Sequence, residues 1–273
     1  DTATVASVIL PVFQPRVTDG LTIALAELPA WIQLRASFSD LAWKPDPFDL
    51  AINRVNPQNL KETGLRLTCH KLLESLNAMT AAQRKQACAA IYGLLERCQD
   101  WFEWHHVAFD ASRTAPHPSL NALISAWIRQ HPHKTQAHYL LLNLLRAERV
   151  SAEIADLAAE VLASPHGKPR VLADIAETLC QSMPTERSAE AVRQWASAHC
   201  RERHAGYLLA QLVRKGDESA RQWACDWATS WATDPSANWV LEALCEVSLR
   251  DPKLRDQCLA WIQSGHAEAN PGY

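Results

Sequence analysis

A signature anchored by tryptophan recurs with a period of about 34 residues through the second half of the chain, and it constrains the fold more than any other feature. Its anchor positions are Trp127, Val161, Trp195, Trp227 and Trp261, which follow one another at nearly equal intervals. A period of about 20 to 50 residues is typical of stacked units that bury their apolar faces only against their neighbours. The period therefore predicts an all-α fold, an α-solenoid of antiparallel helical hairpins.

Two further positions accompany each anchor at fixed offsets. Ten places after it stands a small or compact residue: Ala137, Val171, Ala205, Ala237 and Pro271. Two places beyond stand Tyr139, Ala173, Tyr207, Trp239 and Tyr273. A small residue lets two helices approach closely, and we expect the aromatic side chain to fill the groove beside the next hairpin's tryptophan. The tryptophans are interpreted as core residues, with an outward-facing Trp223 or Trp231 that anchors a partner as the alternative.

The segment 1–58 differs from the rest of the chain. Six prolines between Pro11 and Pro57 interrupt it, which disfavours long regular helices. We expect one helix over residues 21–28, a second short element over 31–38 and a loop over 43–48. This irregular N-terminal segment is interpreted as a cap or as the edge of an upstream domain.

A first helical hairpin and a connection are predicted over residues 59–118. Leucines from Leu60 onward form one apolar helix face. Thr80 and Gln83 have the spacing of a capping box, which predicts a second helix from Thr80 to about Cys98. Residues 101–118 are expected to be an irregular connection.

The repeat array is assigned to residues 119–273. Prolines at His131-Pro132, Ser164-Pro165 and Asp234-Pro235 punctuate its junctions. The predicted inner helices cover residues 134–147, 168–181, 201–214 and 236–249, and their partners cover 151–163, 186–198, 217–231 and 253–264. Because an open array normally ends in a polar cap, the stop at Tyr273 leads us to expect a fragment of a longer protein.

Composition restricts the classes of partner and compartment. Twenty-seven basic and thirty acidic residues give a net charge of −3, so no global electrostatic case exists for a nucleic-acid partner. The eight cysteines show no C-x-x-C pair and are interpreted as reduced, mostly buried thiols. No apolar run is long enough to span a membrane, and no secretory signal is apparent. We therefore expect a cytoplasmic protein with no membrane partner.

The repeat period, the helix-turn-helix pattern and the prolines between units resemble the tetratricopeptide-like (TPR-like) helical repeats. The resemblance covers residues 119–273 and, more loosely, 59–100. The Trp-x-x-Leu-Gly-x-x-Tyr pattern of that family is absent, and Trp127, Trp195, Trp227 and Trp261 stand where its consensus prefers a small residue.

The repeat style also resembles the C-terminal repeat arrays of bacterial STAND-type NTPase sensors, including antiviral ones. That resemblance implies recognition of a protein ligand by the array, with a nucleotide-binding module elsewhere in a larger signalling or defence protein.

One string has the spacing of a catalytic motif. His105-His106-Val-Ala-Phe-Asp110 resembles the H-H-x-x-x-D motif of condensation-type acyl-transfer enzymes. The resemblance would make His106 a general base and Asp110 its orienting group. Ala111 replaces the usual glycine, and those enzymes need a mixed α/β scaffold that a helical chain does not provide. The main interpretation is a loop whose histidines form hydrogen bonds or face water.

Cofactor chemistry has weaker signals. His131, His133 and His138, with His117 nearby, have spacings at which imidazoles bind zinc, but a shared tetrahedral geometry is not evident. No phosphate-binding glycine motif occurs. We predict neither a metal nor another cofactor.

The sequence predicts a non-enzymatic interaction or sensor module that binds a protein or peptide on a concave helical surface. The alternatives are the acyl-transfer enzyme and a structural spacer between domains. The polar side chains expected to line the surface are His138, Asn143, Arg146, Glu177, Gln181, Gln211, Arg214, Asn238 and Glu242.

Overall fold

A computed structural model describes residues 47–60, 64–146, 150–164, 166–234, 236–248 and 256. All regular elements in these ranges are helical, which confirms the predicted all-α class. No helix in this part of the chain is long and apolar enough to cross a membrane. The elements expected over residues 21–28, 31–38 and, apart from Asp256, 253–264 lie outside the described residues.

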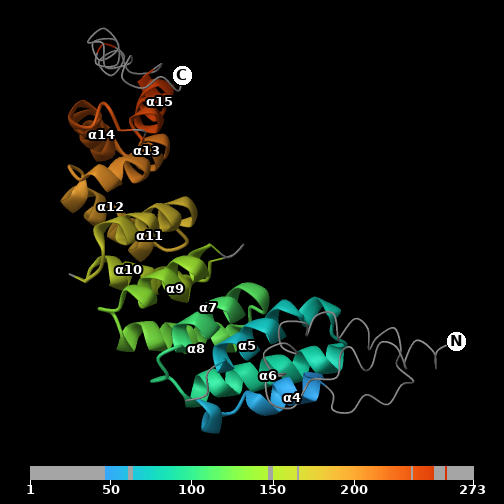
Figure 1. Cartoon of the computed structure of the whole chain (residues 1–273). Helices are drawn as coiled ribbons and strands as arrows, with labels where there is room; N and C mark the ends of the chain where they lie inside the picture. The colour runs from blue at the N-terminus through green and yellow to red at the C-terminus, as the bar shows by residue number, and fades with distance from the viewer. Residues whose placement is uncertain are drawn as a thin grey trace, which may run out of the picture. The chain divides into compact units, whose positions relative to one another are not determined.

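The chain divides into two compact units, residues 1–127 and 128–273. Unit 1 contains α4 (Pro47–Arg54), α5 (Leu65–Glu74), α6 (Ala81–Arg97), α7 (Trp104–Thr114) and most of α8 (Pro118–Gln130). Short 3-10 turns lie at η1 (Pro57–Asn59) and η2 (Leu76–Ala78). Helix α5 packs against α4, α6 and α7 (Figure 1). Leu72, Ile91 and Leu94 are fully buried between these helices.

Helix α6 begins at the predicted capping box. The Thr80 hydroxyl accepts the backbone N–H of Gln83, and the Gln83 side chain accepts the backbone N–H of Thr80. Two amides at the helix start, which have no partner within the helix, are thereby satisfied. The predicted end near Cys98 is also correct, because α6 ends at Arg97.

Two segments expected to be irregular are helical. Helix α4 begins at Pro47, a residue whose fixed backbone angle suits the first helical position. Helix α7 occupies the segment predicted as an irregular connection, and its Trp104, Val107, Ala108 and Ala111 are buried. These four positions recur at helical spacing, so burial of one apolar face stabilises the helix despite its weak start signal.

Unit 2 contains α9 (Thr135–Leu145), α10 (Ala152–Leu162), α11 (Pro169–Ser182), α12 (Glu186–His199), α13 (Gly206–Arg214), α14 (Glu218–Ser230) and α15 (Ala237–Ser248). Each begins and ends close to its predicted bounds, except that the 3-10 turn η3 (Arg203–Ala205) precedes α13. Ser151, Thr185 and Asp217 cap α10, α12 and α14 through their side-chain oxygens.

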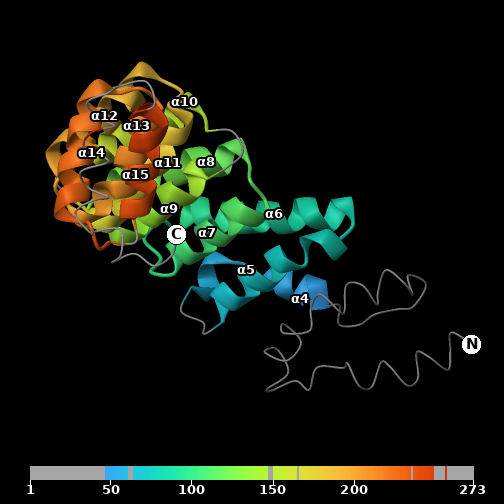
Figure 2. The same ribbon diagram turned by 90° about the horizontal axis from the view of Figure 1, so that it is seen from above.

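Contacts in unit 2 join every second helix. Helix α11 packs against α9 and α13, and α13 against α15; α12 likewise packs against α10 and α14. The helices lie one above another along the unit, and they overlap when the view is turned (Figures 1 and 2). We refer to α9, α11, α13 and α15 as the A helices, and to α10, α12 and α14 as the B helices.

The signature residues form much of the core. Trp127, Val161, Trp195 and Trp227 are all buried, as are the compact residues at offset ten that the structure describes: Ala137, Val171, Ala205 and Ala237. The indole N–H of Trp227 donates to the Glu202 carbonyl at 2.7 Å, and that of Trp127 donates to the Gln99 carbonyl at 3.1 Å. The signature tryptophans therefore fill the core and two of them also satisfy a loop carbonyl. Trp223 and Trp231 are only partly exposed.

Candidate functional site

Three aromatic side chains on the A helices point to solvent. Tyr139 is 50% exposed, and Tyr207 and Trp239 are each 44% exposed. The Tyr207 and Trp239 rings lie 6.3 Å apart between centroids, so neighbouring A helices bring them together. We call these three residues the aromatic row. Apolar side chains that lie together on a surface often mark an interaction site, and tyrosine and tryptophan are enriched among the energetic centres of protein interfaces.

These aromatic side chains are expected from the sequence to fill the groove beside the next hairpin's tryptophan, but the structure leaves about half of each one exposed. Each stands two residues after a fully buried alanine, namely Ala137, Ala205 or Ala237. A residue advances by about 100° around a helix, so two positions separate the side chains by roughly 200°. Burial of the alanine, which lies in the first turn of the helix or directly before it, therefore directs the aromatic side chain to the opposite side.

Polar side chains continue the same exposed face along α9 and α13. Asn143 and Arg146 follow Tyr139 at helical spacing, and Gln211 and Arg214 follow Tyr207. Arg214 links two neighbouring helices, because its guanidinium lies 3.2 Å from Glu242 and 3.0 Å from Glu246 on α15. The surface beside the aromatic row is therefore polar and carries both signs of charge.

Eight of the nine residues predicted to line a binding surface reach solvent. Arg146, Gln181, Arg214 and Glu242 are exposed, and Asn143, Glu177, Gln211 and Asn238 are partly exposed. The prediction for His138 is wrong, because this residue is fully buried. His138 directly follows Ala137 on α9, and both side chains face the core. The sequence analysis also did not predict that the aromatic row is exposed. Its offset of two residues from the buried alanines could have indicated this, because two positions turn a side chain to the opposite side of a helix.

His138 has a defined role inside unit 2. Its Nε2 lies 2.9 Å from the Pro132 carbonyl oxygen, to which it donates, whereas its buried Nδ1 has no hydrogen-bond partner among the described residues. Gly167, with a φ of +133°, passes so close that an added Cβ would lie 2.9 Å from His138 Cε1. Burial, with a further contribution from His166, lowers the pKa of His138 below its ordinary value of 6.5. The imidazole thus acts as a neutral structural donor.

A hollow opens on the A-helix face where the aromatic row is interrupted. The position equivalent to Tyr207 on α11 is Ala173, which is buried and has no ring to cover the surface. A cavity of about 260 Å³ lies there. It is lined by Arg170, Ala173, Asp174, Glu177, Arg203, His204, Tyr207, Asp234 and Ser236. We call it the Ala173 pocket.

The pocket has one neutralised wall and one acidic wall. Arg203 pairs with Asp234, which also accepts hydrogen bonds from the backbone and hydroxyl of Ser236. On α11, Asp174 and Glu177 have no salt bridge among the described residues. Burial, and then the charge of Asp174, raise the pKa of Glu177, while Arg146 lowers it. Glu177 is therefore a partly desolvated carboxyl group beside a second acid.

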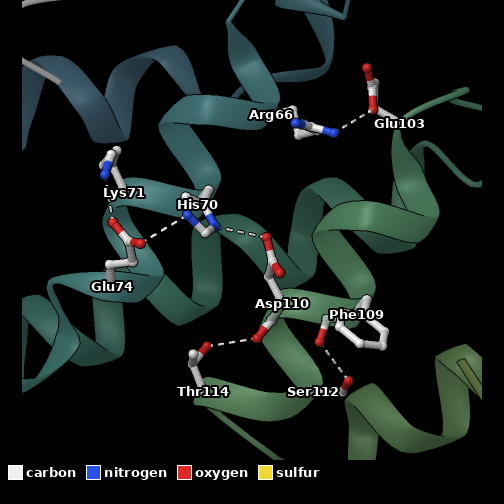
Figure 3. Close-up of polar contacts among 9 residues, drawn as sticks. All are labelled: Arg66, His70, Lys71, Glu74, Glu103, Phe109, Asp110, Ser112 and Thr114. Atoms are coloured by element: carbon white, nitrogen blue, oxygen red, sulfur yellow. Dashed lines mark hydrogen bonds and ion pairs between the residues drawn. The ribbon is translucent and has the colours of Figure 1, made fainter. Parts of the chain in front are cut away.

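The string with catalytic spacing forms a different set of contacts in unit 1. His105, His106 and Asp110 all lie on α7, so the expected loop is wrong. Asp110 Oδ2 contacts His70 Nδ1 at 2.9 Å, whereas His106 Nε2 lies 3.7 Å from Glu103. Figure 3 shows His70 between Asp110 and Glu74. The structure thus pairs Asp110 with a histidine from another helix and not with His106.

One of the His70 contacts joins two helices, since Asp110 lies on α7, and the other lies within α5. Both ring nitrogens of His70 are occupied, since Glu74 Oε1 lies 2.9 Å from Nε2. Lys71 also contacts Glu74 at 2.7 Å, and it lowers the pKa of that carboxyl group through this hydrogen bond, with a smaller contribution from His70. These groups are partly exposed, where ion pairs contribute little stability, about 0 to 1 kcal/mol each.

No arrangement suited to a metal ion occurs among the residues that the structure describes. His138 is engaged by the Pro132 carbonyl, which removes it from the histidine cluster considered in the sequence. Comparison with models of protein families, with curated proteins and with solved structures finds no match to this chain.

Proposed function

We propose that unit 2 is a solenoid of helical hairpins with a period of about 34 residues, and that its A-helix face binds an extended peptide or a protein segment. The observation that carries this proposal is the aromatic row, in which Tyr207 and Trp239 stand side by side and nearly half exposed. Rigid aromatic side chains contribute large contact areas at low entropic cost, and they are frequent energetic centres of interfaces.

The surroundings of the row support a peptide ligand. Polar and charged side chains flank the aromatic rings, notably Gln211, Arg214 and Glu242, so a bound peptide would meet a polar rim beside its apolar contacts. This arrangement of apolar centre and polar rim is typical of protein interfaces. Such a module fits a cytoplasmic protein in which the array recognises a ligand for another domain, as the resemblance to signalling sensors implies.

The test is selection of a displayed library of random-sequence peptides on the chain, followed by affinity measurements on synthetic peptides from the selection. Truncation of hot-spot aromatic residues typically costs about 2 kcal/mol or more, so Tyr207→Ala and Trp239→Ala should each weaken binding by roughly 30-fold. Phe102→Ala is the matched control, because Phe102 is 74% exposed but belongs to unit 1.

Two outcomes would contradict the proposal. One is a selection that enriches no peptide, which is the result that a structural spacer predicts. The other is peptides whose affinity falls equally with Phe102→Ala and with Tyr207→Ala, because this would place the binding surface away from the aromatic row.

A further inference from the structure

The Ala173 pocket differs from the rest of the A-helix face in shape. Ala173 stands in line with Tyr139, Tyr207 and Trp239, and its small side chain leaves a hollow beside the Tyr207 ring. The volume of about 260 Å³ is below the range of about 300 to 1,000 Å³ found for sites of drug-sized ligands. Its size therefore suits one long side chain of a larger ligand.

The charges on the pocket walls favour a cation. Arg203 is balanced by Asp234, so this pair presents little net charge to a ligand. Asp174 and Glu177 stand at i and i+3 on α11 and both line the hollow, where a cation would relieve their mutual repulsion. Two cationic or titratable groups also line the hollow: Arg170 in the first turn of α11 and His204 in η3, both exposed to water. Arg146 acts on Glu177 from outside the lining.

The Tyr207 ring supplies the remaining part of such a site. It lines the pocket together with the acidic wall and also contacts Trp239. A guanidinium or ammonium group over an aromatic face is attracted by the ring, and a carboxylate adds charge-assisted hydrogen bonds. An acidic wall combined with an aromatic ring is thus complementary to a long basic side chain.

We propose that the Ala173 pocket binds an arginine or lysine side chain of the peptide that occupies the A-helix face. Asp174 and Glu177 accept hydrogen bonds from the cationic group, and Tyr207 contacts its face or its aliphatic stem. This inference rests on the proposed peptide-binding function and names the residue class that the peptide must carry beside its apolar anchors.

The probe that tests the pocket by itself is N-acetyl-arginine methylamide, with the citrulline derivative as its uncharged equivalent. The full chain carries four tyrosines, so ring-labelled tyrosine gives few NMR signals, and Tyr207→Phe identifies that of residue 207. We expect the arginine derivative to shift the Tyr207 signal and the citrulline derivative to leave it unchanged. A glutamate derivative that shifts the signal more than the arginine derivative would overturn the proposal.

Charge variants supply the second arm. A hydrogen bond to a charged group contributes about 1.5 to 3 kcal/mol, so Glu177→Gln should weaken binding of the arginine derivative by on the order of tenfold, and the double variant with Asp174→Asn by more. Asp226→Asn on α14 is the control, since Asp226 is exposed and lies outside the pocket lining. Circular dichroism verifies that each variant is folded, and unchanged affinity in a folded double variant refutes the proposal.

Peptide selection separates this inference from the proposed function. If peptides selected on the wild-type chain contain a basic residue and peptides selected on the Glu177→Gln chain do not, the result supports both the pocket assignment and the peptide-binding function. Enriched peptides without a basic residue, together with no response to the arginine derivative, leave the peptide-binding face intact and overturn the pocket assignment. A selection that enriches nothing overturns both.

Discussion

The close contact between Gly206 and Trp227 provides the sharpest test of the packing in unit 2. Gly206 is the first residue of α13, and its φ of −51° is ordinary for any residue. A Cβ at this position would lie 2.7 Å from Trp227 Cη2 and 2.8 Å from Cζ2, and 3.1 Å from the Ser236 hydroxyl. Glycine is therefore favoured at position 206 because the rigid, buried Trp227 ring leaves no room for a Cβ, and not because of the backbone conformation. We expect Gly206→Ala to destabilise the protein.

The magnitude follows from two opposing effects. Overpacking of a well-packed core costs about 1 to 3 kcal/mol, and the ring of Trp227 cannot retreat because it is buried and its N–H is held by the Glu202 carbonyl. Alanine is favoured over glycine by up to about 1 kcal/mol inside a helix, and by less at the first helical position. The expected net destabilisation is about 1 to 2 kcal/mol.

The assay is urea unfolding followed by circular dichroism, with Gly93→Ala as the matched control. Gly93 lies inside α6, and a Cβ there would meet only the flexible end of Arg97, at 3.5 Å. The same substitution should therefore stabilise unit 1 by about 0.5 to 1 kcal/mol. If glycine-to-alanine substitution lowers the free energy of unfolding at position 206 and raises it at position 93, the loss at position 206 comes from the contact with the Trp227 ring.

A double-mutant cycle with Trp227→Phe isolates that contact. The smaller ring removes the atoms that an alanine side chain at position 206 would strike, although Trp227→Phe also loses the hydrogen bond to Glu202. We expect a favourable coupling of about 0.5 to 3 kcal/mol. The reasoning is refuted if Gly206→Ala is as stable as the wild type while Gly93→Ala is stabilising, or if the two substitutions at 206 and 227 are simply additive.

Three further outcomes are expected. His138 has a lowered pKa in the folded state, so the unfolded chain binds more protons just below pH 6.5 and stability falls as pH decreases through that window. The stability advantage of the wild type over His138→Gln should shrink from about pH 7.5 toward about pH 5, and a constant difference in urea titrations would contradict this reasoning. Thr80→Ala should destabilise α6 by about 1 kcal/mol in urea titrations, whereas Thr80→Asn, which retains a capping oxygen, should cost little. Peptide mapping after brief iodoacetamide treatment should find exposed Cys245 modified and Cys69 unmodified until the chain unfolds, because burial raises the pKa of Cys69 to about 12.

The local signals in the sequence predicted most helix bounds. The capping box at Thr80 correctly starts α6, and the repeat period with its junction prolines placed most A and B helices within a few residues of their observed ends. These features act over one helical turn, so neighbouring residues contain the relevant information. The same reasoning failed for α7, since its first turn has no capping side chain and its stability comes from burial of Trp104 and Val107.

The binding face could be predicted only in part. Polar residues such as Gln181, Arg214 and Glu242 were correctly expected at the surface, whereas His138 turned out to be buried and the aromatic row exposed. The assignment of His138 failed because a polar residue beside the buried Ala137 was expected to face solvent, whereas a hydrogen bond to the Pro132 carbonyl makes a buried neutral imidazole acceptable. The Ala173 pocket had no sequence signal of its own, since its lining comes from α11, η3, α13 and the segment just before α15.

The sequence by itself determined the helical class, the caps and the positions of the signature tryptophans, because these depend on periodicity and on interactions between near neighbours. Tertiary structure decided which side of each A helix faces the core, that Asp110 meets His70 from α5 and not His106, and where a hollow opens beside Tyr207. The physical reason is that these outcomes depend on which distant helices pack together, and packing rotates each helix until its smallest and most apolar side is buried.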